Sequence, residues 1–310
     1  DSYLDRLFNH FLRYQALAPS GQAWPSRIKR LIIGLAFGET DRDSLDPILL
    51  GQTKDGRLED IELTIWLIRL LVEYVKETGD FHYYHRGVGY RDGGEGTVLQ
   101  HFIRALHYCE AARSDEGLIS IPAPGDECLE STAATGQLAQ SWREALPVLE
   151  HFGEHDLVER YAKQLDRLKA AVDRRLRQGR FYSSGIHSTL GKIGAKGKPR
   201  QIEAAAQCWL IIGGLIDSKR AEGALGAVRQ KLSSKFGTLN FAPAYPRVAE
   251  DGFGESADSP GSGHNSTVTT ETVAELIWAE ALIGQGAGVY KLWGQINPLA
   301  RSIQPSAYGA

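Results

Sequence analysis

The spacing of apolar positions along the chain predicts a mostly helical protein. Between Leu58 and Thr78, isoleucine and valine recur every three or four residues, and Gly79 follows directly. This spacing gathers the apolar side chains on one broad face of a helix, and glycine commonly ends a helix. We therefore expect a long helix over residues 58–78.

The same spacing recurs along the rest of the chain, and the segments that carry it come in pairs. One member of a pair is rich in small and apolar residues, and the other is amphipathic, with charged residues on its outward side. The further helices are expected at residues 97–111, 131–152, 157–176, 201–216, 221–232, 269–284 and 288–295.

Long segments rich in glycine and proline separate the predicted helices. Structureless loops of this length are uncommon in compact domains and are usually functional. Paired helices joined by long loops predict an all-α fold, an (α/α)6 toroid in a single domain over residues 1–310. An α-solenoid of irregular repeats is the alternative, but no clean repeat supports it. The loops cover residues 34–56, 81–96, 117–130, 181–200 and 240–266.

Composition narrows the class of protein. Hydrophobic residues make up 42% and charged residues 24%, and the net charge is −3, so a soluble protein without a basic surface for nucleic acid is expected. No apolar run is long enough for a transmembrane helix. Cys109, Cys128 and Cys208 are widely spaced, which indicates free thiols, a reducing cytoplasmic location and no metal site. The sequence contains no methionine, even at its start, so we expect a piece of a longer protein.

The first candidate for sugar binding is the turn at residues 40–47, which holds three carboxylates and one arginine. Carboxylates accept hydrogen bonds from neighbouring sugar hydroxyls, and arginine fixes the orientation of a carboxylate by a bidentate contact. Arg42, Asp43 and Asp46 are therefore candidate substrate-binding residues. The alternative is an ordinary capping turn, with Ser44 or Asp43 as the N-cap of a short helix.

The second candidate is the acidic end of the loop at residues 117–130, just before a predicted helix. It holds Asp126, Glu127 and Glu130. Cleavage of a glycosidic bond needs a carboxylic acid that protonates the departing oxygen. The alternative is helix capping, because acidic side chains favour the positive end of a helix dipole.

A third candidate is the polar segment at residues 256–270, which is rich in small hydroxyl residues and contains His264. Histidine and hydroxyl groups could hold phosphate. An ordinary surface loop has the same composition, so that alternative stays open.

Several motifs follow one another in a recognisable order. Residues 9–15 read N-H-F-L-R-Y-Q, residues 42–46 read R-D-S-L-D, residues 73–80 read E-Y-V-K-E-T-G-D, and residues 295–298 read Q-I-N-P. In this order they resemble glycoside hydrolase family 94, formerly glycosyltransferase family 36, which includes the phosphorylases of cellobiose, cellodextrin, chitobiose and β-1,2-glucan. The resemblance runs over nearly the whole chain and implies its catalytic (α/α)6 barrel.

The resemblance also implies a reaction: inverting phosphorolysis of a β-glucosidic oligosaccharide to a sugar 1-phosphate. One aspartic acid protonates the glycosidic oxygen while inorganic phosphate attacks the anomeric carbon from the opposite face. Phosphate is already an anion, so no second carboxylate is required. No metal or organic cofactor is implied; the partners are the oligosaccharide and phosphate, and a homodimer is left open.

The resemblance assigns roles to the candidate residues. Arg42, Asp43 and Asp46 would hold the sugar in the donor subsite. Asp126 is the first choice for the acid, with Glu127 and Glu130 behind it. The phosphate-binding residues would be His264 and Thr270.

This sequence departs from the family pattern at several places. The W-N-D residues after the first acid are absent, Glu271 stands where the family has a phosphate-binding histidine, and the family's late W-T-W-Y-T-G-S segment and N-terminal β-sandwich are missing. An inverting hydrolase or a transglycosylase on the same barrel is therefore the second hypothesis. Water would need a base about 6.5–9.5 Å from the acid, with Glu255, Asp258 or Glu271 as candidates. A non-catalytic glycan-binding domain is the third hypothesis.

Overall fold

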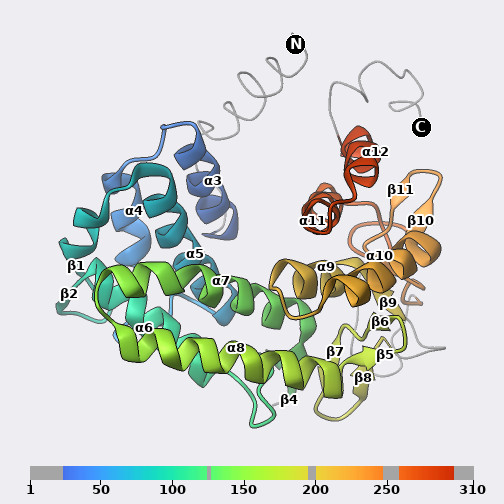
Figure 1. Cartoon of the computed structure of the whole chain (residues 1–310), viewed down its shortest axis with the longest axis horizontal. Helices are drawn as coiled ribbons and strands as arrows, with labels where there is room; N and C mark the ends of the chain where they lie inside the picture. Colours follow the sequence, from blue (N-terminus) through green and yellow to red (C-terminus); the bar gives the residue numbers. More distant parts are fainter. Residues whose placement is uncertain (1–23, 124–126, 195–199, 247–257, 297–310) are drawn as a thin grey trace. The chain divides into compact units, whose positions relative to one another are not determined.

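The computed structural model describes residues 24–123, 127–194, 200–246 and 258–296. The chain divides into two compact units: the first comprises Asp1–Arg113 and Ser141–Ala162, and the second comprises Ser114–Gln140 and Lys163–Ala310. Helices dominate both units, and the strands are short (Figure 1). Over the described residues, the structure therefore has the predicted helical character.

The first unit is built around a long buried helix, α5 (Ile61–Thr78), against which α3 and α6 pack. The side chain of Asp60 caps the beginning of α5, and Gly79 ends it in the left-handed conformation, at φ 68°. The helix ends at Thr78 as predicted, because Gly is a preferred terminator. It begins at Ile61 rather than at Leu58, because Asp60 is a preferred N-cap. The other elements are α3 (Trp24–Ala36), α4 (Arg42–Leu49), the 3-10 helix η2 (Phe81–His85), β1 (Gly87–Gly89), β2 (Glu95–Thr97) and α6 (Val98–Ala111).

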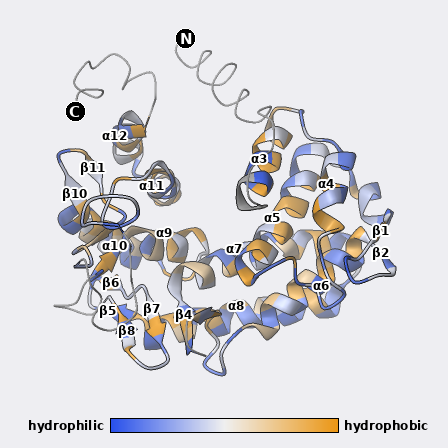
Figure 2. Cartoon of the chain, turned by 180° about the vertical axis from the view of Figure 1, so that it is seen from behind, coloured by the Kyte–Doolittle hydropathy of each residue, from blue (hydrophilic) through white to orange (hydrophobic). Residues whose placement is uncertain are grey.

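Two long helices contribute residues to both units. They are α7 (Thr132–His151) and α8 (His155–Arg175). Figure 2 shows hydrophilic and hydrophobic residues alternating along α8, as an amphipathic helix requires. Both helices lie within two residues of their predicted bounds.

The second unit contains the remaining helix pairs. α9 (Ala204–Ile212) is almost wholly buried, whereas α10 (Ser218–Leu232) is amphipathic, which confirms the expected contrast between the members of a pair. The last pair is α11 (Thr270–Leu282) and α12 (Gly286–Ile296). The core joins α9, α10 and α11 through buried residues that include Trp209, Leu225 and Leu276.

The segment at residues 117–130, expected to be a loop, instead contains a β-hairpin, so that expectation is wrong there. β3 (Ser120–Ala123) and β4 (Glu127–Ser131) pair antiparallel, and β7 (Gly185–His187) and β8 (Gly191–Ile193) complete a four-stranded sheet. The strands are too short to show a clear alternation of apolar and polar residues, and Pro122 argues against a strand. The strand β4 holds Glu127 and Glu130 in extended backbone immediately before α7.

Three smaller strand pairs complete the second unit. They are β5 (Arg177–Gln178) with β6 (Phe181–Tyr182), β9 (Ile202–Glu203) with β12 (Phe241–Ala242), and β10 (Ser233–Ser234) with β11 (Gly237–Thr238). The predicted helix at 201–216 starts later than expected because β9 occupies its first residues.

α7 and α9 cross at glycine. A Cβ atom on Gly136 would collide with the backbone oxygen of Trp209, and one on Gly213 would lie 2.5 Å from the oxygen of Gly136. Only glycine at these positions lets the two helix backbones approach so closely. The crossing therefore fixes the two helices against each other.

Searched over its described ranges, the chain has no helix with the length and apolar character needed to cross a membrane.

Candidate functional site

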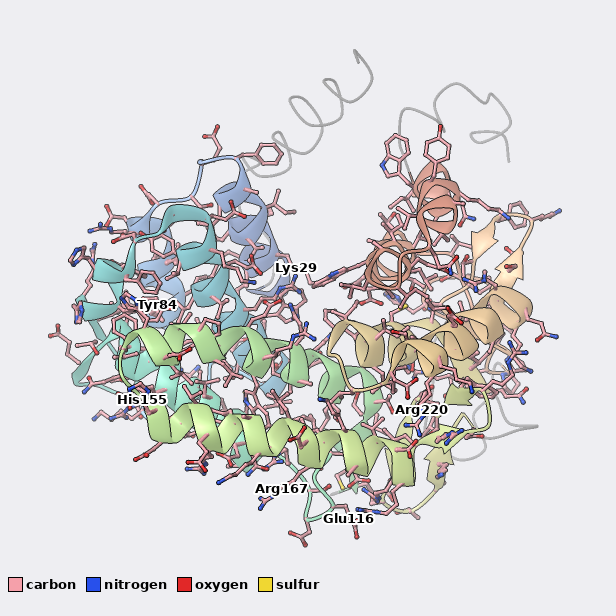
Figure 3. The ribbon with its side chains drawn as sticks, in the orientation of Figure 1. Lys29, Tyr84, Glu116, His155, Arg167 and Arg220 are labelled. Atoms are coloured by element: carbon pink, nitrogen blue, oxygen red, sulfur yellow. The ribbon has the colours of Figure 1, made fainter. Side chains whose placement is uncertain are left out.

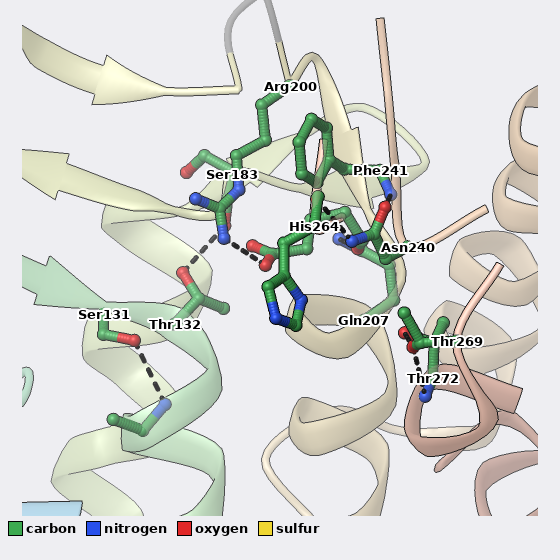
Figure 4. Close-up of polar contacts among 12 residues, drawn as sticks. Ser131, Thr132, Ser183, Arg200, Gln207, Asn240, Phe241, His264, Thr269 and Thr272 are labelled. Carbon is green, nitrogen blue, oxygen red and sulfur yellow. Dashed lines mark hydrogen bonds and ion pairs between the residues drawn. The ribbon is translucent and has the colours of Figure 1, made fainter. Parts of the chain in front are cut away.

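Three helices, α7, α9 and α11, begin near one another in the second unit. The Thr132 N–H donates to the Ser184 carbonyl at 3.0 Å, while the Tyr182 N–H donates to the side-chain oxygen of Gln207 at 2.8 Å. The chain segment at 182–184 thereby links the first turn of α7 to the first turn of α9. Thr132 and Gln207 are both labelled in Figure 4.

Asn240 links α9 to the segment that precedes α11. Its carbonyl accepts from the N–H of Ala204 at 2.8 Å, and its own N–H donates to the Thr267 carbonyl at 2.7 Å. The first turn of a helix presents N–H groups and a partial positive charge. Three helix beginnings at one end of the unit therefore favour an anion there.

The acidic strand β4 leads into α7 at the same end. Neighbouring residues of a strand point to opposite faces of its sheet. Glu127 thus lies on the same face as Leu129, and Leu129 pairs with His187 of the neighbouring strand β7. Glu130 lies on the other face, so the two glutamates cannot both face one substrate.

Glu127 is held by two side chains of the β7–β8 turn. Its carboxylate accepts from the Thr189 hydroxyl at 2.6 Å and lies 3.1 Å from Nε2 of His187. His187 is only 1% exposed, and its Nδ1 accepts from the N–H groups of Thr189 and Leu190 at 3.3 Å. Since Nδ1 accepts from these two N–H groups, a ring proton of His187 is carried by Nε2.

Glu130 is buried and paired with Arg175 at 2.6 Å. A proton on Glu130 would leave the guanidinium facing a neutral group, so this geometry suits a structural ion pair better than a proton donor. Asp126, the first choice for the acid, lies outside the described residues, directly before Glu127.

His264 lies in a loop anchored to the same end of the unit. Its N–H donates to Asp258 Oδ2 at 3.0 Å, and its carbonyl accepts from the Asn240 side chain at 2.9 Å. Its residue surface is exposed. Thr270 is the exposed first residue of α11, immediately after the N-cap Thr269. The structure thus brings His264, Thr270 and β4 to one end of one unit.

Of the alternative bases, Asp258 contacts the His264 backbone, as described above. Glu271 lies exposed in the first turn of α11. Glu255 lies outside the described residues.

Arg200, a cation at this end of the unit, was not among the residues expected from the sequence. Its guanidinium pairs with Glu203 and lies 5.3 Å from the ring of Phe241 (Figure 4). Burial alone would lower the pKa of Arg200, but Glu203 and Tyr245 outweigh burial and raise it. Arg200 therefore keeps its charge beside the helix beginnings.

The first unit carries the predicted sugar-binding residues at the beginning of α4. Arg42 Nε donates to Asp80 Oδ2 at 2.7 Å, and the Tyr74 hydroxyl donates to the same oxygen at 2.6 Å. Burial would raise the pKa of Asp80, but the hydrogen bonds from Tyr74 and Arg42 outweigh it and lower the pKa. Asp80 is thus an ionised anchor for Arg42.

Asp43 and Asp46 share a second cation, Arg86. One guanidinium nitrogen of Arg86 lies 3.1 Å from Asp43 Oδ1, and the other lies 2.6 Å from Asp46 Oδ2. The Tyr83 hydroxyl also donates to Asp46 at 2.9 Å. Asp46 is thereby fixed, whereas Asp43 is well exposed and free to accept hydrogen bonds from a ligand.

An open cavity of about 700 Å³ lies against this cluster. Its volume is within the range of small-molecule sites, and the mixture of carboxylates, guanidinium groups and hydroxyls suits a sugar. Its lining residues are Thr40, Asp41, Arg42, Asp43, Tyr74, Thr78, Asp80 and Arg86.

The alternative expectation for this turn, with Ser44 or Asp43 as the N-cap, names the wrong residue. Asp41 is the N-cap of α4, and its carboxylate accepts from both the N–H and the hydroxyl of Ser44, at 2.9 Å and 2.7 Å. Ser44 is therefore the donor in the third position of the helix and Asp43 lies in its first turn.

Replacing Asp80 by asparagine is expected to lower the free energy of unfolding by about 1.5–3 kcal/mol near neutral pH, because the contacts to Arg42 and Tyr74 lose a charged acceptor. A carboxyl group with a lowered folded pKa stabilises the protein above its unfolded pKa, about 3.9. That stabilisation is lost as the pH falls through the folded pKa. The difference between the proteins should therefore shrink below about pH 4, as followed by urea unfolding.

Glu77→Gln is the matched control for Asp80, because Glu77 is exposed on the same helix, α5. It should unfold like the parent protein at every pH. A difference for Asp80→Asn that stayed constant from neutral to acid pH would contradict the assignment.

Within the described ranges, no cluster of histidine, cysteine, aspartate and glutamate is arranged to hold a metal ion.

Comparison with known proteins places these residues in a wider context. Residues 40–307 match the sequence model described as "Glycosyl hydrolase 94 superfamily, catalytic domain". A cellobionic acid phosphorylase of Neurospora crassa is 27% identical over 216 residues, which are 66% of this chain and 27% of that protein. A solabiose phosphorylase of Paenibacillus borealis is 25% identical over 247 residues, 76% of this chain and 32% of that protein. The chain thus spans about a third or less of the length of these relatives.

Solved structures show the fold independently of close sequence identity. A rhamnosidase from Klebsiella oxytoca, solved with rhamnose bound, superposes with a TM-score of 0.63 at 13% identity, covering 95% of this chain and 54% of that one. A second rhamnosidase, from Bacillus sp. GL1, gives a TM-score of 0.62. These likenesses confirm the predicted all-α (α/α)6 fold class.

Proposed function

Since this chain belongs to the glycosyl hydrolase 94 superfamily, as a catalytic domain, we propose that it cleaves a β-glycosidic bond with inorganic phosphate. The products are a sugar 1-phosphate, formed with inversion, and the shortened acceptor. The named activities of its relatives, phosphorylases of cellobionic acid, solabiose and N,N'-diacetylchitobiose, support this reaction class.

In the proposed reaction, a phosphate oxygen forms a bond to the anomeric carbon while the bond from that carbon to the glycosidic oxygen breaks. The departing oxygen takes a proton from a carboxylic acid, which is left as a carboxylate. Asp126 is the proposed acid. Glu127 is next in line, because it lies on the sheet face shared with His187 and Thr189. The buried ion pair of Glu130 argues for a structural role instead.

One observation carries the proposal: an acidic strand and an anion-favouring site occur at the same end of the second unit. β4 leads into α7. Hydrogen bonds through Tyr182, Ser184 and Asn240 connect the beginnings of α7, α9 and the segment before α11. His264 and Thr270 lie in this region and are the proposed phosphate-binding residues. Helix beginnings bind phosphate readily.

Arg42, Asp43 and Asp46 are the proposed donor-sugar residues. Their cavity in the first unit supports this role, since the Asp43 carboxylate is exposed and Arg42 is held by Asp80. No metal or organic cofactor enters the proposal, in which phosphate is the co-substrate.

The test of the reaction is a β-glucooligosaccharide incubated with and without inorganic phosphate. Phosphate should be required for turnover, and sugar 1-phosphate should accumulate in proportion to the shortened oligosaccharide, as measured by chromatography. Equal turnover in both conditions would remove phosphorolysis. Saturable sugar binding with no turnover in either condition would favour a glycan-binding domain.

Hydrolysis or transglycosylation is the second candidate, favoured by the position of Asp258. Its carboxylate lies at the backbone of His264, in the region proposed for phosphate. A base there could activate water or a sugar hydroxyl instead. Asp258→Asn should abolish turnover in that case, whereas phosphorolysis should need only the acid.

The remaining features are proposals of the same kind. We propose a single barrel domain over residues 1–310 and a cytoplasmic location, which the free cysteines support. Measurement of the mass in solution tests whether the chain forms a homodimer.

A further inference from the structure

A second cavity in the second unit, of about 440 Å³, lies between the β5–β6 hairpin and the first turn of α10. It shares none of the residues assigned to the proposed reaction. Its lining residues are Arg177, Gly179, Arg180, Tyr182, Asp217, Lys219, Arg220 and Gly223. Four of these are cations and one is an acid.

Two of the cations, Arg177 and Arg220, form ion pairs with aspartates. Arg220, labelled in Figure 3, lies 3.0 Å from Asp173 and 3.5 Å from Asp217. Arg177 lies 3.7 Å from Asp173. These contacts offset much of the charge of Arg177 and Arg220 and fix their positions.

The other two cations, Arg180 and Lys219, form no ion pair with the described residues. Arg180 follows Gly179 in the hairpin turn, and its guanidinium lies against α10 where Gly226 leaves room, because a Cβ on Gly226 would lie 3.0 Å from it. Lys219 is in the first turn of α10, whose N–H groups add a partial positive charge. The cavity therefore keeps an excess of positive charge.

A buried hydroxyl gives a second, independent indication of a ligand. Tyr182 lines the cavity and is 2% exposed, and its hydroxyl has no hydrogen-bond partner among the described residues. Buried hydroxyl groups are nearly always satisfied. Burial raises the pKa of Tyr182, so the group stays a donor at neutral pH.

We propose that this cavity binds a phosphate group, free or carried by a monosaccharide. Arg180 and Lys219 supply the neutralising charge, and the Tyr182 hydroxyl donates to a phosphate oxygen. Arginine and lysine are the usual partners of phosphate, and the volume leaves room for a sugar beside it. This site does not depend on the proposed function.

The test is calorimetric titration of the chain with inorganic phosphate. A double variant, Arg180→Ala with Lys219→Ala, should bind phosphate at least about tenfold more weakly at this site, because it loses two charge-assisted contacts. Tyr182→Phe should also weaken binding without lowering the melting temperature. Arg167→Ala, which removes an exposed arginine from α8 (Figure 3), is the matched control and should bind like the parent.

His264→Ala separates this site from the phosphate site of the proposed reaction. Binding that survives in His264→Ala and is lost in the double variant supports the cavity, even if no glycoside is turned over. Unchanged affinity in the double variant, or loss of all binding in His264→Ala alone, overturns it. Titration with glucose 1-phosphate distinguishes the two sources: tighter binding than inorganic phosphate identifies a sugar phosphate.

Discussion

The variant Asp126→Asn is expected to cleave β-glucooligosaccharides about 10²–10⁴-fold more slowly than the parent, because general acid catalysis contributes a factor of this size. The amide cannot give a proton to the departing oxygen. Turnover is measured under saturating phosphate, with the unfolding curve as a check that the fold is intact.

A substrate with an activated leaving group sharpens this test. A β-glucoside of an acidic phenol needs no proton on its departing oxygen, so the defect of Asp126→Asn should shrink greatly on it. Glu127→Gln is the companion variant. If it shows the large, leaving-group-dependent loss and Asp126→Asn does not, the acid is Glu127.

The second large effect is expected at Arg175. Replacing it by methionine should lower the free energy of unfolding by about 3–5 kcal/mol, because the buried carboxylate of Glu130 loses its partner. Adding Glu130→Leu should restore much of the stability, since an apolar pair can replace a buried ion pair. The measurement is urea unfolding.

Arg174→Met is the matched control for this variant. Arg174 is adjacent in the chain but pairs with Glu116 on the surface, where both side chains are more than half exposed. Surface ion pairs are worth about 0–1 kcal/mol, so the control should unfold almost like the parent. Equal losses of unfolding free energy in Arg175→Met and Arg174→Met would contradict the distinction between a buried and a surface ion pair. If the double variant of Arg175 and Glu130 is stable but inactive, Glu130 returns to the catalytic candidates.

Much of the fold follows from local sequence rules. α5 begins directly after its N-cap Asp60 and ends directly before Gly79, because capping and left-handed glycine are local preferences, readable without tertiary contacts. Thr97 and Gln100 likewise form a capping box that starts α6 as predicted.

The β4 hairpin escaped prediction because part of its pairing is with β7, more than fifty residues away. A short strand with a proline partner carries little periodic signal. His187 was missed for the same reason: a single histidine shows no pattern, and only the sheet register brings it to Glu127. Arg200 and the basic cavity at α10 also depend on contacts between distant segments.

The candidate sugar cluster was found because Arg42, Asp43 and Asp46 are close in sequence as well as in space. The residues that anchor this cluster were not found, because Asp80 and Arg86 lie beyond the C-terminal end of α5. Motif residues can therefore be read from a local stretch, but the groups that orient them cannot.

The glycine crossing of α7 and α9 has a consequence for tolerance to mutation. Peptide groups meet there without intervening side chains, so no rotamer change nearby can alter the spacing of the two helices. The distance from β4 to the loop that Asn240 anchors is thereby insulated from repacking of the surrounding core. Sequence drift in that core can proceed while the groups proposed for the reaction keep their separation.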